Sequence, residues 1–303
     1  MANNKVLDMA IAFLNSFRVH NKDIPLCLIP YNDDFSQIEK LKTVYNFSVF
    51  DNKELLETCD AISVKFHGNV VGAYRKMVIW EGVFKQFIYI DIDTVLVDNL
   101  SFVWQHLSHC KIFTSHSDLP EIRKFVWKNS IYSKNKLNRS QIEYATNTGF
   151  IVSTKNKLPM HWIIDQVEEA LTLKEDMVLF CMEQPFLNYL IVTSGYNYGS
   201  LLRFLITDFG TGYDRGIKLE FWAGLPGGKT NNGRLIDPNN RPIFLIHWAG
   251  VWRENNADLT KIPYQKLWEY YRNVDPLHLP EPDNKPETKI KSNHPILRFL
   301  KIK

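Results

Sequence analysis

The sequence predicts an α/β fold in which helices flank a mixed sheet, and two observations lead to it. Over roughly the first hundred of the 303 residues, segments with helical spacing of apolar residues alternate with short apolar runs, joined by short polar links. Helices and strands that alternate in this way form a sheet covered by helices on both faces. Beyond about residue 100 the alternation loosens, which favours a mixed sheet over a purely parallel one.

Each element is predicted from its own local pattern. Apolar residues three or four positions apart predict helices at 6–17, 35–45, 71–84, 158–173 and 184–192. Short apolar runs bounded by polar residues, glycine or proline predict strands at 26–29, 47–50, 87–92, 111–114, 149–153 and 242–248. Many of the 14 glycines fall between residues 210 and 233, which indicates a loop, and four prolines between 276 and 286 indicate an extended tether.

Composition excludes several classes of protein. The 36 basic and 33 acidic side chains give a net charge of +3, too small for a protein that binds nucleic acid through its phosphates. The 4 cysteines are far apart and include no C-x-x-C pair, as expected for thiols in a reducing compartment. No apolar run approaches the ~20 residues of a membrane span. We therefore expect a cytoplasmic protein without a cleaved secretion signal.

A pair of aspartates at the end of a predicted strand is the most informative feature. The apolar run Phe87-Ile-Tyr-Ile leads directly into Asp91-Ile-Asp93. Residues i and i+2 of a strand point to the same side, so both carboxylates can face one cation. A hard divalent cation removes their mutual repulsion, and Mg²⁺ is commonly bound by one or two carboxylates together with substrate phosphates. The pattern predicts a metal site for a phosphorylated ligand.

Two enzyme classes use such a pair. Phosphatases of the haloacid dehalogenase type carry D-x-D followed by Thr or Val, and there Asp91 would be the nucleophile and Asp93 the acid or base. That family places the motif on its first strand, whereas about 90 residues precede it in this chain. The other class is the nucleotide-sugar glycosyltransferases of the GT-A fold, in which a D-x-D strand ends the nucleotide-binding half. A sugar-binding module without catalysis is a third interpretation.

Further motifs resemble family 8 of the GT-A glycosyltransferases, which includes glycogenin and bacterial lipopolysaccharide galactosyltransferases. In chain order, the similar segments are Lys76-Met-Val-Ile-Trp80, the D-x-D strand, Asn147-Thr-Gly149-Phe150, Glu183-Gln184-Pro-Phe-Leu-Asn188 and His247-Trp-Ala-Gly250-Val-Trp-Arg253. The resemblance implies that Lys76 contacts the donor and that Asn147 and Gly149 contact the donor sugar. It implies that Glu183 and Gln184 act at the reacting centre. It also implies that the sugar is transferred with retention of configuration.

The last of these segments also suits the chemistry without the resemblance. His247 ends an apolar strand and can supply an imidazole to the cation of Asp91 and Asp93, a ligand set that suits Mn²⁺ as well as Mg²⁺. Gly250 would let the backbone approach a diphosphate, and Arg253 would neutralise its charge. A histidine beside a tryptophan can equally be a satisfied core residue.

Together these features predict a metal-dependent glycosyltransferase that moves a sugar from a nucleoside diphosphate donor, UDP-linked, to a hydroxyl of a glycan or glycolipid. We expect one GT-A domain over residues 1–273, with a nucleotide-binding half (1–99) and an acceptor half (100–273). Residues 274–303 would form a proline-rich tether and a basic tail. The tail either contacts an anionic membrane surface peripherally or packs on the domain.

Overall fold

The computed structural model describes residues 1–115, 117, 120–208, 229–231, 234–236, 243–250 and 264–282. Its strands are β1 (Leu26–Leu28), β2 (Phe47–Val49), β3 (Gln86–Ile90), β4 (Thr94–Leu96), β5 (Ile112–Thr114), β6 (Phe150–Thr154), β7 (Tyr198–Ser200), β8 (Lys229–Asn231), β9 (Arg234–Ile236) and β10 (Leu245–His247). Its α-helices are α1 (Leu7–His20), α2 (Ser36–Lys40), α3 (Lys42–Tyr45), α4 (Lys53–His67), α5 (Pro120–Arg123), α6 (Arg139–Tyr144), α7 (Met160–Leu171), α8 (Gln184–Thr193), α9 (Leu201–Asp208) and α10 (Gln265–Asn273). Its 3-10 helices are η1 (Asn4–Val6), η2 (Gly72–Trp80), η3 (Ser101–Ser108), η4 (Asn129–Ser133), η5 (Lys174–Asp176) and η6 (Leu179–Cys181).

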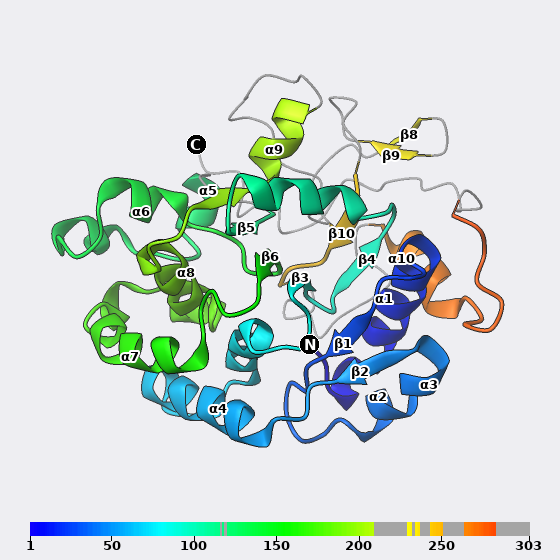
Figure 1. Ribbon diagram of the computed structural model, residues 1–303, viewed down its shortest axis with the longest axis horizontal. Helices are drawn as coiled ribbons and strands as arrows, with labels where there is room; N and C mark the ends of the chain where they lie inside the picture. The colour runs from blue at the N-terminus through cyan, green and yellow to red at the C-terminus, as the bar shows by residue number, and fades with distance from the viewer. Residues whose placement is uncertain are drawn as a thin grey trace.

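The strands form a mixed arrangement, which confirms the predicted α/β class. In the largest sheet the order is β3-β6-β5-β7, with β6 antiparallel to both of its neighbours and β7 parallel to β5. β1 and β2 pair in parallel, and β10 pairs antiparallel with β4. The second pairing brings a strand from late in the sequence to the segment that directly follows β3 (Figure 1).

Helices cover both faces of the strand β3. Phe87 and Tyr89 belong to one buried cluster together with η2, α4, α7 and α8. Ile90, on the other face, belongs to a second cluster with α1 and η3. Successive side chains of β3 thus point to opposite faces, as expected for a strand that is buried on both sides. In Figure 1, α4 lies along α7 at one edge of the molecule, and α10 lies along α1 at another.

Polar contacts attach α10 to the first helix. The buried side chain of Asn15 donates a hydrogen bond from Nδ2 to the Tyr271 carbonyl oxygen at 2.7 Å. The hydroxyl of Tyr271 lies 2.7 Å from Nε2 of His20. Buried amide and hydroxyl groups are costly without such partners, so these bonds fix how α10 sits against α1.

Two predicted helices have a different form. The helix expected at 71–84 is the 3-10 helix η2, and the long α-helix before β3 is α4, which was not among the predicted elements. α4 carries ordinary end signals, because Asn52 accepts a hydrogen bond from the Leu55 amide at 3.1 Å and Gly68 ends the helix with φ of 76°. The helix expected at 35–45 is divided into α2 and α3.

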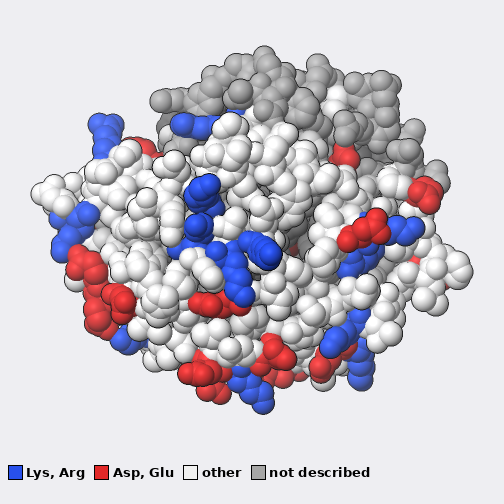
Figure 2. Space-filling model, viewed as in Figure 1, with Lys and Arg blue, Asp and Glu red and all other residues white. Residues whose placement is uncertain are grey.

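Charged side chains are distributed over the described surface, and Figure 2 shows lysines and arginines gathered near the middle of one face. Lys85 and Lys155 lie at neighbouring ends of β3 and β6, where the Lys155 amide donates to the Lys85 carbonyl oxygen at 3.0 Å. Like charges on paired strands disfavour the pairing slightly, so the apolar residues of β3 and β6 supply its stability. Among the described helices, none has both the length and the apolar character needed to cross a membrane.

Candidate metal and donor site

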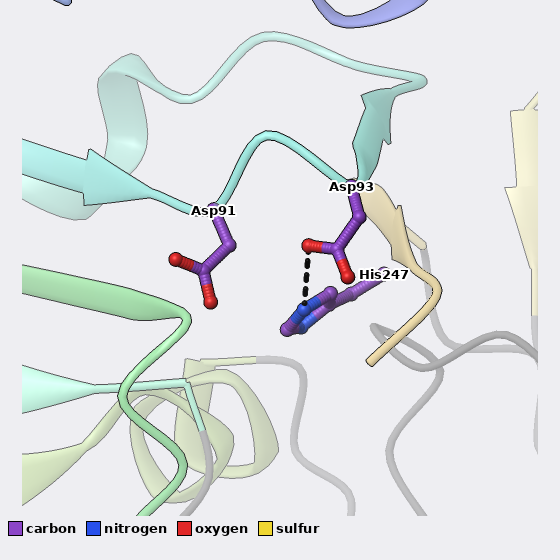
Figure 3. A group of neighbouring side chains, drawn as sticks. All are labelled: Asp91, Asp93 and His247. Atoms are coloured by element: carbon purple, nitrogen blue, oxygen red, sulfur yellow. Dashed lines mark ion pairs between the residues drawn. The ribbon is translucent and has the colours of Figure 1, made fainter. Parts of the chain in front are cut away.

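The aspartate pair lies in the tight connection between β3 and β4. Asp91 directly follows β3 and Asp93 directly precedes β4, so the strand ends slightly earlier than predicted. Three hydrogen bonds fix the connection: the Asp91 amide donates to the Gly149 carbonyl oxygen at 2.8 Å, Thr94 Oγ1 donates to the Asp91 carbonyl oxygen at 2.8 Å, and the Trp248 amide donates to the Asp93 carbonyl oxygen at 2.9 Å. The two carboxylates point into the same space (Figure 3).

His247 joins them from β10. In the antiparallel pair of β10 and β4, His247 lies opposite Thr94, and its Nε2 atom is 3.3 Å from Oδ1 of Asp93. One ligand atom from each of Asp91, Asp93 and His247 lies within 4.8 Å of the others. The imidazole is almost completely buried, whereas both carboxylates retain some exposure. The three predicted metal ligands therefore converge (Figure 3), and both carboxylates are partly exposed.

The charges of these groups are interdependent. Burial alone would raise the pKa of Asp91, but the positive charges of Lys76 and His247 hold it below its ordinary value. Burial alone would lower the pKa of His247, and the Asp93 carboxylate raises it above the ordinary value. A cation placed between the Asp91 and Asp93 carboxylates would be attracted by both of them.

Lys76 links the metal site to the start of α8. Its ammonium group lies 3.2 Å from Oδ1 of Asp91 and 2.6 Å from Oε1 of Glu183, and its side chain is only 3% exposed. It also donates to the Thr148 carbonyl oxygen at 3.2 Å. Burial would lower the pKa of Lys76, but the Asp91 and Glu183 carboxylates hold it above its ordinary value. One buried cation thus compensates two carboxylates that the sequence places far apart.

The turn Asn147–Gly149 packs between these groups. Asn147 Oδ1 accepts a hydrogen bond from the Gly149 amide at 2.8 Å, and Gln184 Oε1 accepts one from the Thr148 amide at 3.4 Å. Gly149 leaves no room for a side chain, because an added Cβ would collide with the His247 ring and lie 2.9 Å from Asp91 Oδ2. The glycine of the predicted Asn-Thr-Gly motif is thus required by the close approach of this turn to the metal site.

Two hydroxyl groups that donate hydrogen bonds to carboxylates of the site were not predicted from the sequence. The Tyr89 hydroxyl donates to Asp91 Oδ1 at 2.6 Å, and the Thr148 hydroxyl donates to Glu183 Oε1 at 3.0 Å. Tyr89 lies on β3 and precedes Asp91 by two residues, so the period of two that was used to pair the aspartates could also have identified it. Thr148 stands between two predicted residues, but its partner is more than thirty positions away in sequence.

The remaining predicted residues lie after β10. Gly250 is exposed and has φ of 74°, a conformation that glycine adopts readily, in the turn that follows His247. Arg253, the glycine-rich segment around 210–228 and the basic tail lie outside the described residues. The roles expected for Gly250 and Arg253 stay predictions.

The three converging side chains fit a divalent cation. Opposite ligands of Mg²⁺ are about 4 Å apart, given bonds of about 2.0–2.1 Å. The ligand atoms of Asp91, Asp93 and His247 lie within 4.8 Å of one another, so small side-chain rotations bring them to that spacing. Two carboxylates and one imidazole are donors that both Mn²⁺ and Mg²⁺ accept, and the exposed side leaves positions for ligand oxygens.

Comparison with known proteins identifies structures with a similar fold. No protein-family model matches the sequence, and no curated protein matches it. Among solved structures, the glycosyltransferase GlyE of Streptococcus pneumoniae superposes with a TM-score of 0.50 at 13% identity, over 91% of this chain and 59% of GlyE. The bifunctional glycosyltransferase WbbM superposes with a TM-score of 0.55 at 14% identity, over 91% of this chain and 49% of WbbM. LgtC, a galactosyltransferase solved with donor and acceptor sugar analogs, superposes with a TM-score of 0.51 at 12% identity, over 89% of this chain and 93% of LgtC.

The chain has a GT-A-like glycosyltransferase fold. It spans little more than half of GlyE and about half of WbbM, but nearly all of LgtC. At these sequence identities the likeness establishes the fold. In this GT-A-like fold the Asp91, Asp93 and His247 group lies just beyond the carboxyl end of β3, the edge at which α/β sheets bind their ligands.

Proposed function

We propose that this protein is a metal-dependent glycosyltransferase of the family 8 type, which moves a sugar from a UDP-linked donor to a hydroxyl of a glycan or glycolipid with retention of configuration. The convergence of Asp91, Asp93 and His247 in a GT-A-like fold carries the proposal. Residues 1–273 would form the transferase domain, with nucleotide-binding and acceptor halves that meet near residue 100. Residues 274–303 would form the tether and tail.

The chemistry of the site supports this function. When bound, Mn²⁺ or Mg²⁺ would supply positive charge to the diphosphate as the bond to the sugar breaks. Asp91, Asp93 and His247 would hold the cation, and Arg253 with the backbone at Gly250 would contact the phosphates. Asn147 and Gly149 would border the donor sugar. Glu183 and Gln184 would face the reacting centre, where the Lys76 ammonium group lies 2.6 Å from Oε1 of Glu183.

Titration calorimetry with UDP tests the proposal. We expect UDP to bind in the presence of Mn²⁺ and not after chelation. We expect Asp93→Ala to weaken the metal-dependent binding more than about tenfold, because the cation loses one of its carboxylates. Asp165→Ala, an exposed aspartate on α7, is the matched control and should bind as the unmodified protein does. Binding of UDP that is indifferent to Mn²⁺ and to Asp93 would contradict the proposal.

Tyr89→Phe tests the support of the metal site without touching a ligand. The change removes the hydroxyl that donates to Asp91 Oδ1 at 2.6 Å and keeps the buried ring. Removing a partner that orients a metal ligand typically weakens metal binding by about 10–100-fold. We expect a loss in that range for Mn²⁺, measured by calorimetry, with little change in thermal stability. Tyr132→Phe, whose exposed hydroxyl contacts Glu143, should leave Mn²⁺ binding unchanged.

A further inference from the structure

Lysines gather at the end of the largest sheet that lies away from the candidate metal site. Lys85 directly precedes β3, Lys111 directly precedes β5, and Lys155 directly follows β6, which runs antiparallel to both of these strands. Asp91 follows the opposite end of β3. At about 3.3 Å per residue, β3 separates Lys85 from Asp91 by about 20 Å. This end of the sheet is therefore distinct from the metal site.

Neighbouring strand ends bring these lysines together with Lys157. The Lys155 amide donates to the Lys85 carbonyl oxygen at 3.0 Å, and β6 lies between β3 and β5, so Lys155 stands between Lys85 and Lys111. The ammonium group of Lys157 lies 4.7 Å from the centre of the Tyr196 ring, and Tyr196 shortly precedes β7, the next strand of the same sheet. We call Lys85, Lys111, Lys155 and Lys157 the lysine patch.

The lysine patch has little acidic compensation. Its residues are exposed, apart from the half-buried Lys157, and within the described part of the chain none of them forms an ion pair. By contrast, the surface lysines Lys65 and Lys136 each contact a glutamate. Figure 2 shows basic side chains gathered over the region where Figure 1 places β3, β5 and β6, with most acidic side chains nearer the rim of that face. The patch is thus a local excess of positive charge in a protein whose net charge is only +3.

An apolar and an aromatic side chain flank the lysine patch. Val83, in the turn between η2 and β3, is 69% exposed, and Tyr196 is 37% exposed. Val83 precedes Lys85 by two residues, and Tyr196 contacts Lys157. Surfaces that bind membranes peripherally combine such side chains, because lysines are attracted to anionic headgroups while apolar and aromatic groups enter the boundary between lipid and water.

We propose that the lysine patch, with Val83 and Tyr196, docks this protein on an anionic lipid surface. Each lysine near such a surface is attracted to the negative headgroups, the valine gains by leaving water, and the tyrosine is favoured at the boundary between lipid and water. The candidate metal site then lies at the far end of β3, about 20 Å further from the lipid. Docking by this surface therefore leaves the metal site open to ligands in solution.

Other anionic partners fit the patch less well. Adjacent strands are about 4.8 Å apart, so the ends of β3 and β5, two strands apart, are separated by about 10 Å, which suits an array of negative charges better than one phosphate group. Protein interfaces are depleted in lysine and enriched in arginine, which is more weakly hydrated. A soluble polyanion would leave Val83 in water, whereas a lipid surface accepts both the charges and the apolar side chain.

Binding to lipid vesicles tests the proposal. The patch variant carries Lys85→Gln, Lys111→Gln, Lys155→Gln and Lys157→Gln. The matched control has the same net charge and carries changes at exposed lysines elsewhere, namely Lys22→Gln, Lys40→Gln, Lys42→Gln and Lys53→Gln. We expect the unmodified protein and the control to bind vesicles of phosphatidylglycerol with phosphatidylcholine, and not vesicles of phosphatidylcholine alone. We expect the patch variant to bind the anionic vesicles at least about 50-fold more weakly, with an unchanged melting temperature.

Val83→Ser tests the apolar contact separately from the charges. Its affinity for the anionic vesicles should fall about three- to tenfold, because less apolar surface leaves water on binding. Val70→Ser is the matched control, since Val70 is 56% exposed in the connection between α4 and η2, and it should bind as the unmodified protein does. Equal affinities for the two variants would contradict the part assigned to Val83.

Acetylation of lysines, followed by mass spectrometry, locates the contact. On anionic vesicles we expect the lysine patch to lose most of its labelling, while Lys22 and Lys40 keep theirs. Binding that survives in the patch variant, through the basic tail or any other surface, would overturn the proposal. Protection of the patch by soluble polyphosphate without binding to vesicles would also overturn it and assign the patch to a soluble polyanion. No readout uses UDP or a cation, so failure here leaves the proposed function standing.

Discussion

Replacing Gly149 with alanine is expected to abolish metal-dependent UDP binding. An added Cβ would collide with the Cε1 atom of His247 and lie 2.9 Å from both Asp91 Oδ2 and Asn147 Oδ1. The turn cannot retreat without losing the hydrogen bond from the Asp91 amide to the Gly149 carbonyl oxygen. Displacement of His247 and Asp91 would spread the ligand atoms beyond the reach of one cation. We expect Mn²⁺ affinity to fall more than about 100-fold and the free energy of unfolding to fall by about 1–3 kcal/mol.

Gly82→Ala is the matched control for this substitution. A Cβ at Gly82 would meet only the Ile79 carbonyl oxygen, at 3.4 Å, which is an ordinary contact. Calorimetry with Mn²⁺ and UDP, together with urea denaturation, should show the control close to the unmodified protein. If Gly149→Ala bound Mn²⁺ as well as Gly82→Ala does, the close approach of the turn to the metal site would have no functional role.

Lys76→Met should cause the largest loss of stability. Methionine keeps most of the apolar volume but removes the ammonium group that lies 2.6 Å from Glu183 and 3.2 Å from Asp91. Removing one member of a buried ion pair typically costs about 3–5 kcal/mol, because the remaining charge is left without compensation. Urea denaturation would measure the change as a lower midpoint with an unchanged slope.

A second substitution separates charge from packing at this position. In the double variant Lys76→Met with Glu183→Gln, the buried carboxylate is neutral, so we expect a large part of the lost stability to return. Lys65→Met is the control, since Lys65 pairs with Glu168 on the surface and both side chains are at least half exposed. That change should cost less than about 1 kcal/mol. Equal losses for Lys76→Met and Lys65→Met would show that the buried pair contributes no more than a surface pair.

Local patterns predicted β1, β2, β3, β5, β6 and β10, whereas β4, β7, β8 and β9 were not predicted. The apolar run before His247 placed that residue at a strand end, which is confirmed. Asp91 and Asp93 face the same space, but they lie in the connection between β3 and β4 and not on one strand, so the period of two is not the reason. These signals are local, because they depend on residues close in sequence. The helix α4 was not predicted, although Asn52 and Gly68 mark its ends and its buried residues Leu56, Cys59, Ile62 and Phe66 recur at helical spacing.

Long-range pairing could not be read from the sequence. No local pattern near His247 indicates that β10 pairs with β4. No local pattern near Lys76 indicates that its partners are Asp91 and Glu183. For Lys76 and Glu183 only the resemblance to family 8 suggested a shared site, whereas His247 was also assigned to the cation of Asp91 and Asp93 from its chemistry. The sequence also did not predict that β1 and β2 pair apart from the remaining strands, because local patterns indicate strands and not which strands are neighbours.

The pairing of β10 with β4 has a consequence for how the protein acquires activity during synthesis. Asp91 and Asp93 leave the ribosome long before His247, and the hydrogen bond between Trp248 and Asp93 forms only when both are present. Contacts between residues so distant in sequence form late in folding. A nascent chain that contains β1 to β7 but not β10 would lack His247, so the proposed metal site would be complete only after β10 has paired with β4.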